Sequence, residues 1–220
     1  MIVVGSVIVL AIFLFVGWAV STEMFQHRAW RRRVESGDVD IVGALILEAM
    51  GGWRRARPPK GLPAGLWAGV QGAQLVALTA DSATVSASAD AEFHTESGRR
   101  VQVASNLDQA IALAARVIDM MLYDVPNLRL ALVRVDVYST FTGEDGQAVQ
   151  KPILSATADR AVADDIAWEA LTPAEILGRF DTTFERSPNG QGLPIELAPV
   201  QGEPPKAATA EQAISPGEVS

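Results

Sequence analysis

The sequence predicts a membrane protein with a single N-terminal transmembrane helix and a small α+β domain. Residues 2–20 carry no charged side chain. Beyond them, segments with strand periodicity alternate with segments of helical periodicity. About 160 residues remain between the apolar segment and a tail rich in proline and glycine, which is enough for one well-packed core. We therefore expect one anchored domain.

The apolar segment at residues 2–20 is long enough to cross a bilayer. A helix of this length spans roughly 28 Å, close to the hydrocarbon thickness of about 30 Å. A cleaved signal peptide is the alternative, because Ala19-Val20-Ser21 resembles a cleavage site. No Lys or Arg precedes the segment, however, and it exceeds the usual length of about 7–15 residues. We expect an uncleaved anchor.

Basic residues predict how this anchor is oriented. Arg28, Arg31, Arg32 and Arg33 follow the segment closely, whereas only the α-amino group lies on its other side. Positively charged flanks remain in the cytoplasm. The expected topology therefore has the N-terminus outside and the C-terminal domain in the cytoplasm.

Residues 21–57 form a predicted basic juxtamembrane segment with helical character. Asp38 can cap a helix at residues 39–50, which Gly51 is expected to end. This helix is apolar on almost every side and has basic flanks that contain tryptophan. It is predicted either to lie in the headgroup region or to be buried against the soluble domain or a partner subunit. The interfacial interpretation assigns lipid contacts to Trp30, Arg28, Arg31, Arg32, Arg33, Trp53, Arg54, Arg55 and Arg57.

A proline-rich linker at residues 58–63 leads to the soluble α+β domain at 64–186. Residues 83–93 alternate apolar or small with polar side chains, which is typical of a strand with one buried face. Further strands are expected at 74–79, 100–104, 128–141 and 148–158, and helices at 106–122, 161–166 and 173–180. The order β-β-β-α-β-β-α predicts an antiparallel sheet with one main helix packed on one face. Pro152 should lie at a sheet edge or a bulge.

The tail at residues 187–220 is rich in proline and glycine and lacks aromatic side chains. Such composition predicts disorder.

Few residues are candidates for chemistry. The chain has no cysteine, and its two histidines are His27 and His94. Asp90, Glu92 and His94 are expected to share one strand face, and Arg134, Asp136 and Tyr138 another. Each set is a weak candidate for a ligand face, and a hydrated sheet surface produces such rows by chance. No nucleotide-binding or hydrolase motif occurs, so we predict no catalytic residue, metal site or cofactor.

Charge excludes one class of partner. Residues 1–60 carry a net charge of +3 and residues 61–220 a net charge of −11. An acidic domain repels phosphate backbones, so nucleic acid is not expected as a partner. The leading hypothesis is a non-enzymatic domain for protein interaction or assembly, with membrane lipid, a partner protein or a second copy as partners. The alternatives are a membrane-anchored enzyme, such as a metal-assisted hydrolase, and a module that senses anionic lipid.

Overall fold

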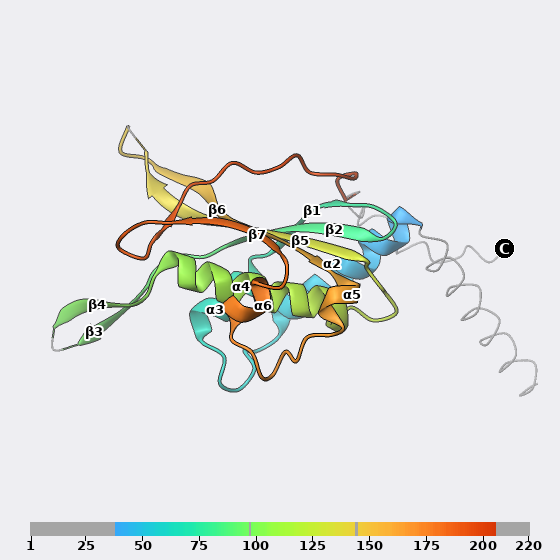
Figure 1. Cartoon of the computed structure of the whole chain (residues 1–220), viewed down its shortest axis with the longest axis horizontal. Coiled ribbons are helices and arrows are strands. Elements are labelled where there is room, and N and C mark those ends of the chain that lie inside the picture. Colours follow the sequence, from blue (N-terminus) through green and yellow to red (C-terminus); the bar gives the residue numbers. More distant parts are fainter. Residues whose placement is uncertain (1–37, 97, 144, 206–220) are drawn as a thin grey trace, which may run out of the picture.

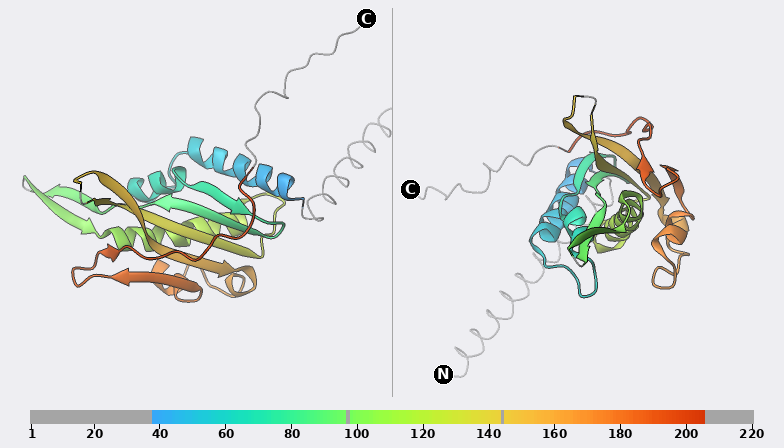
Figure 2. Two further views of the ribbon diagram at one scale, coloured as in Figure 1. Left: turned by 90° about the horizontal axis from the view of Figure 1, so that it is seen from above. Right: turned by 90° about the vertical axis from the view of Figure 1, so that its left-hand side faces the viewer.

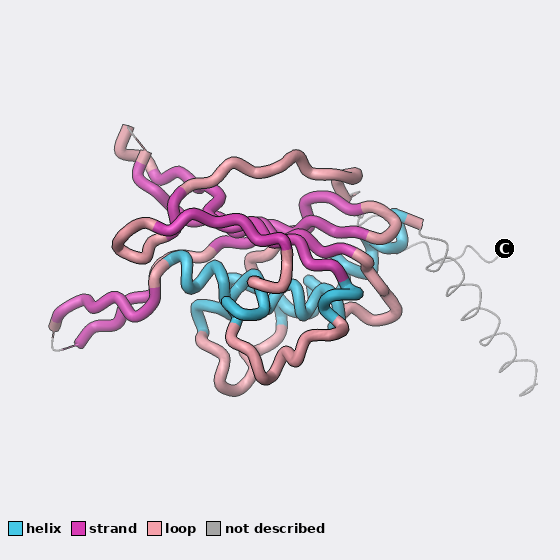
Figure 3. The backbone as a smooth tube through the Cα atoms, in the orientation of Figure 1, coloured by secondary structure: helices cyan, strands magenta, loops and turns pink. Residues whose placement is uncertain are grey.

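The computed structural model describes residues 38–96, 98–143 and 145–205, and shows a small α+β domain (Figure 1). A six-stranded sheet lies in the middle, with helices packed on one face and an irregular C-terminal segment crossing the other (Figures 1 and 3). The predicted anchor at 2–20 lies outside the described residues. No helix within the described ranges is long and apolar enough to cross a membrane.

The sheet is mixed, not purely antiparallel as expected. Its order is β1-β2-β5-β6-β7-β8, and β2 and β5 run parallel while the other neighbours run antiparallel. The strands are β1 (Gln74–Leu78), β2 (Ser82–Ser88), β5 (Leu132–Thr142), β6 (Ala148–Asp159), β7 (Asp181–Arg186) and β8 (Gly192–Leu193). Because a helix connects β2 to β5 across the sheet, the two strands are parallel neighbours.

Four helices account for most of the covered face: α2 (Val39–Arg55), α3 (Ala64–Gln71), α4 (Asn106–Asp119) and α6 (Pro173–Leu177). Helix α4 crosses the middle of the sheet and contacts β5 and β6, while α2 packs beside β1 and α3 lies between α2 and α4 (Figure 2). A π-helical turn, η1 (Met120–Asp124), continues α4, and a short helix, α5 (Arg160–Ala163), follows β6. Several helices thus replace the single main helix that was expected.

Helix α2 belongs to the core of the domain, which decides between the two positions predicted for residues 39–50. Val42, Ile46 and Met50 are at most 1% exposed and join the main apolar cluster. The helix also continues through Gly51 and Gly52 to Arg55. Each internal glycine costs about 1 kcal/mol of helix stability, but burial of the Trp53 indole offsets that loss.

The starts expected for the helices at residues 106 and 173 are confirmed as those of α4 and α6. The Ser105 hydroxyl caps α4 by accepting a hydrogen bond from Asp108 N. Thr172 and Glu175 form a reciprocal capping box at the start of α6. In β6, Pro152 lies at a register irregularity opposite Tyr138, as expected of a strand proline.

The alternating segment 83–93 does not form one strand. Strand β2 ends at Ser88, and β3 (Glu92–Glu96) pairs instead with β4 (Arg99–Ala104) in a separate two-stranded sheet. This hairpin projects from the body of the domain (Figure 1). After Ser88 the chain leaves the main sheet: Ala89 N still donates a backbone hydrogen bond to Tyr138 O, and Asp90 contacts β5 through its side chain.

Residues 187–205, expected to be disordered, have a defined path. After β8, residues 194–205 cross the face of the sheet opposite the helices, and we call them the strap (Figure 1). Ile195 donates its N–H to Pro152 O, and Glu203 exchanges two backbone hydrogen bonds with Leu78. The composition did not predict this path, because backbone contacts order the strap and an apolar sequence pattern does not. The rest of the predicted tail lies outside the described residues.

Candidate binding groove

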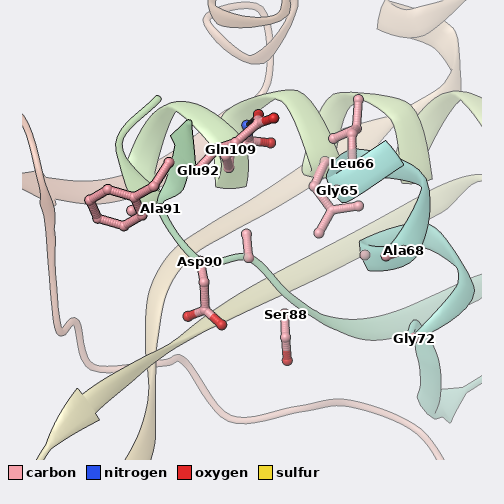
Figure 4. Close-up of a pocket in the computed structure, with 13 residues that line it drawn as sticks. Gly65, Leu66, Ala68, Gly72, Ser88, Asp90, Ala91, Glu92 and Gln109 are labelled. Carbon is pink, nitrogen blue, oxygen red and sulfur yellow. Dashed lines mark hydrogen bonds between the residues drawn. The ribbon is translucent and has the colours of Figure 1, made fainter. Parts of the chain in front are cut away.

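A groove with a volume of about 490 Å³ opens between α3, the first turns of α4 and the segment that joins β2 to β3 (Figure 4). This volume lies within the range of ligand and peptide pockets, roughly 300–1,000 Å³. The residues that line it are mostly small or apolar: Gly65, Leu66, Ala68, Gly69, Gly72, Ser88, Ala89, Asp90, Ala91, Glu92, Phe93, Gln109 and Leu113. They include two carboxylates and no cationic side chain.

Helix α3 forms the wall of small residues. Leu66, Trp67 and Val70 bury one side of the helix in the core, so that its glycines and alanines face the groove. A Cβ at Gly69 would lie 2.7 Å from Leu113 Cδ2 and 3.2 Å from Ser88 O. Gly69 therefore allows α3 to approach both α4 and β2. At Gly65, in contrast, a Cβ would meet nothing within 4 Å.

The predicted row of Asp90, Glu92 and His94 is split. Asp90 Oδ1 accepts hydrogen bonds from Ser139 Oγ at 3.1 Å and Thr140 N at 3.0 Å, which ties the connecting segment to β5. Glu92 Oε2 accepts a hydrogen bond from Gln109 Nε2 at 2.8 Å. Figure 4 shows Asp90 and Ser88 pointing away from Glu92 and Gln109. The two carboxylates thus bind groups on opposite sides of the segment that joins β2 to β3.

His94 lies outside the groove. Its side chain is 67% exposed, and its Nε2 is 3.3 Å from Glu92 Oε1. Within the described residues no group of three His, Cys, Asp or Glu side chains is arranged to hold a metal ion.

The projecting hairpin continues the groove wall. Phe93, which lines the groove, is 39% exposed, and Val101 and Val103 on β4 are 43% and 56% exposed. A two-stranded hairpin outside a larger sheet is marginally stable alone. The apolar side chains of Val101 and Val103 are thus exposed on the projecting hairpin.

The other predicted ligand face lies under the strap. Arg134 Nε donates to Asp136 Oδ1 at 2.9 Å, and the same oxygen accepts a hydrogen bond from Ser155 Oγ at 2.7 Å. Arg134 Nη1 also donates to Pro199 O in the strap at 3.3 Å. Tyr138 is half-buried. A smaller cavity of about 240 Å³ adjoins Arg134, and the ion pair itself joins the sheet to the strap.

The predicted membrane-interface residues are placed only in part. Arg28, Trp30, Arg31, Arg32 and Arg33 lie outside the described residues. Trp53 is 9% exposed in the core, so its indole is not presented to a bilayer. Arg54, Arg55 and Arg57 are exposed at the end of α2.

Two groups with shifted pKa values lie at the opposite end of α4 from the groove. Burial is the main cause that raises the pKa of Asp119, and the neighbouring Arg116 partly counteracts it. Burial and a hydrogen bond with Asp164 raise the pKa of Tyr123 to about 12. Their distance from the groove separates them from any ligand bound there.

Sequence reasoning overlooked α3 and Gln109. The segment 64–72 has three glycines and no charged residue, so local propensity argues against a helix. The available signal was the spacing of Leu66, Trp67 and Val70, which matches one buried helix face. In comparisons with protein families, curated proteins and solved structures, the chain has no significant match.

Proposed function

We propose that this chain is a membrane-anchored interaction protein whose α+β domain binds a basic, partly apolar segment of a partner protein. The observation that carries the proposal is the groove of α3 and Glu92, which leads onto the exposed Phe93 of the projecting hairpin. The apolar residues 2–20 supply the proposed anchor. The Arg residues that follow them favour a cytoplasmic position for the domain.

The chemistry of the groove supports a polypeptide ligand. Small side chains on α3 leave room for the side chains of a bound segment, and Phe93 and Leu113 offer apolar contact. Glu92 places a carboxylate on the groove wall and no lining residue is a cation, which favours Lys or Arg on the partner. These groups bind and orient a ligand, and they offer no nucleophile with an adjacent base.

Site-specific photocrosslinking tests the proposal on the full chain in mild detergent. A photoreactive phenylalanine analogue replaces Phe93, and a second variant carries it at Phe184 on β7. The two phenylalanines are 39% and 40% exposed, so they form a matched pair. We expect position 93 to crosslink to a partner segment that carries Lys or Arg beside apolar residues, and position 184 to give no such product.

The charge requirement is tested with Glu92→Lys, which places a cation in the groove and removes the acceptor of Gln109. We expect this change to lower the yield of the crosslink at position 93 at least about tenfold, as loss of a charge-assisted contact predicts. A crosslinked segment of acidic character, or a yield unchanged by Glu92→Lys, contradicts the proposal. Thermal unfolding of each variant separates a binding defect from a folding defect.

The topology is tested separately by protease access. In right-side-out cells the domain should resist added protease, and in inverted membrane vesicles it should be cleaved. Cleavage in intact cells would place the domain outside and remove the cytoplasmic part of the proposal.

A further inference from the structure

Four basic residues gather where α2 ends and α3 begins, and we call them the basic corner: Arg54, Arg55, Arg57 and Lys60. All four are exposed. No Asp or Glu occurs in the sequence between Glu48 and Asp81. Residues 81–205, in contrast, contain nineteen acidic and nine basic residues. The basic corner is therefore a positively charged surface on a domain that is otherwise strongly acidic.

The cations of the basic corner do not satisfy the last carbonyl groups of α2. Basic side chains near a helix C-terminus commonly satisfy its last carbonyl groups. At α2 two side chains from α3 do this instead. Gln71 Nε2 donates to the carbonyl oxygens of Arg54 at 3.0 Å and Ala56 at 3.1 Å, and Trp67 Nε1 donates to Ala56 O at 3.1 Å.

Three of the four cations remain available to a ligand. Arg54 turns back, and its Nη2 donates to Ala73 O at 3.1 Å. The side chains of Arg55, Arg57 and Lys60 make no hydrogen bond or ion pair with another described residue. The contacts from Gln71 and Trp67 nevertheless hold the backbone of residues 54–56, where the basic corner begins, against α3.

We propose that the basic corner docks on the anionic lipid headgroups of the membrane in which the chain is anchored. The inference rests on the anchor of the proposed function. Lipid phosphate is the anion that such an anchor keeps closest to the domain, and each Lys or Arg near an anionic surface strengthens binding. The acidic remainder of the domain disfavours a nucleic acid at the same place.

Docking at the basic corner brings the C-terminal end of α2 to the headgroups. The helix begins at Val39, next to the N-terminal segment, and its 17 residues span about 25 Å before the basic corner. The bilayer then contacts the cations at the end of α2, and not the apolar face of residues 39–50, which is buried in the core.

A fluorescent label reports docking in the full chain. Because the sequence contains no cysteine, Ala64→Cys adds a single reactive site at the exposed start of α3, beside the basic corner. The labelled chain is placed in nanodiscs of phosphatidylcholine alone or with phosphatidylglycerol. We expect a blue shift of the dye in the anionic nanodiscs only, and its loss at about 1 M salt, where screening acts within roughly 3 Å.

Charge reversal provides the decisive comparison. Arg55→Glu, Arg57→Glu and Lys60→Glu together should reduce the ratio of docked to undocked domain at least about 100-fold, since each basic residue contributes roughly a factor of five. The matched control reverses three exposed cations elsewhere, Arg129, Lys151 and Arg179, and should leave the blue shift unchanged.

Three outcomes overturn the proposal. These are an equal shift in both lipid compositions, a shift that survives reversal of the basic corner, and an equal shift from a label at Ala148→Cys on β6. Partner binding is separable from docking, because crosslinking at position 93 is measured in detergent without lipid. Loss of the crosslink with the blue shift retained would contradict the binding proposal alone.

Discussion

Helices α3 and α4 lie side by side against the sheet, and they reach helical structure by different routes. Helix α4 has a Ser105 cap, a favourable Asp108 in its first turn and apolar residues at helical spacing. Helix α3 has eight residues, two internal glycines and no side-chain cap. Local sequence thus specifies α4, whereas tertiary contacts specify α3. The helix that is weakly specified forms the wall of the proposed groove.

The largest effect should come from filling the closest approach between the two helices. A side chain at Gly69 meets Leu113 and the Ser88 carbonyl, so Gly69→Val should lower the free energy of unfolding by about 2–3 kcal/mol, typical of an overpacked contact. Gly65→Val makes the same chemical change in open space. Chemical denaturation of the two variants should give a clear difference, and equal stabilities would mean that α3 does not need this contact.

Removing the Gln71 side chain, which binds the last carbonyl groups of α2, should have the next largest effect on stability. Gln71→Ala leaves the last carbonyls of α2 with fewer donors, and the loss of two exposed hydrogen bonds and one part-buried one should cost about 1–1.5 kcal/mol. Thermal unfolding measures the loss. Gln109→Ala serves as a control, because Gln109 binds the Glu92 side chain and supports no helix end. A smaller loss for Gln71→Ala than for Gln109→Ala would contradict the role given to Gln71.

The Ser105 cap of α4 is a local contact, in contrast to the tertiary contacts that specify α3, so its removal should affect local structure only. Ser105→Ala removes the acceptor of Asp108 N and should destabilise the domain by about 1 kcal/mol. Ser105→Asp restores an acceptor at this position and should recover most of the loss. If both variants are equally unstable, packing and not capping determines where α4 begins.

The smallest effect concerns pH and the far end of α4. Burial raises the pKa of Asp119 above the ordinary aspartate value of 3.8, so the native state binds this proton more readily than the unfolded state does. The contribution of Asp119 to stability is therefore greatest below pH 3.8 and is lost as pH rises through the native pKa. Asp119→Asn should flatten the pH dependence of unfolding in that range, measured as the difference between variant and parent at each pH.

The same difference, between elements specified by local sequence and elements specified by tertiary contacts, shows how far the sequence predicts the fold. The start of α4 and the capping box at Thr172 were predictable because neighbouring residues create them. The parallel pairing of β2 with β5 was not, because the alternation in β2 indicates a buried face and not the identity of its neighbour. Strand β7 and the path of the strap were missed since both are ordered by partners distant in sequence.

The candidate site was predicted even less completely. Glu92 and Asp90 were identified, but as members of one continuous strand, and the break after Ser88 turns them to different sides. The small residues of α3 carry no functional groups, so their contribution is the space that they leave. Such space becomes visible only when the neighbouring helix and strand are in place.

The strap also protects the sheet from assembly with other sheets. Strand β1 lies at one edge, where unpaired backbone groups would invite pairing with another molecule. Glu203 occupies part of this edge through its two hydrogen bonds with Leu78, and Gly202 permits the approach, since a Cβ there would lie within 2.4 Å of Leu78 O. The C-terminal residues that look dispensable in the sequence therefore help to keep the domain soluble, and shortening the chain before residue 202 would expose a surface prone to aggregation.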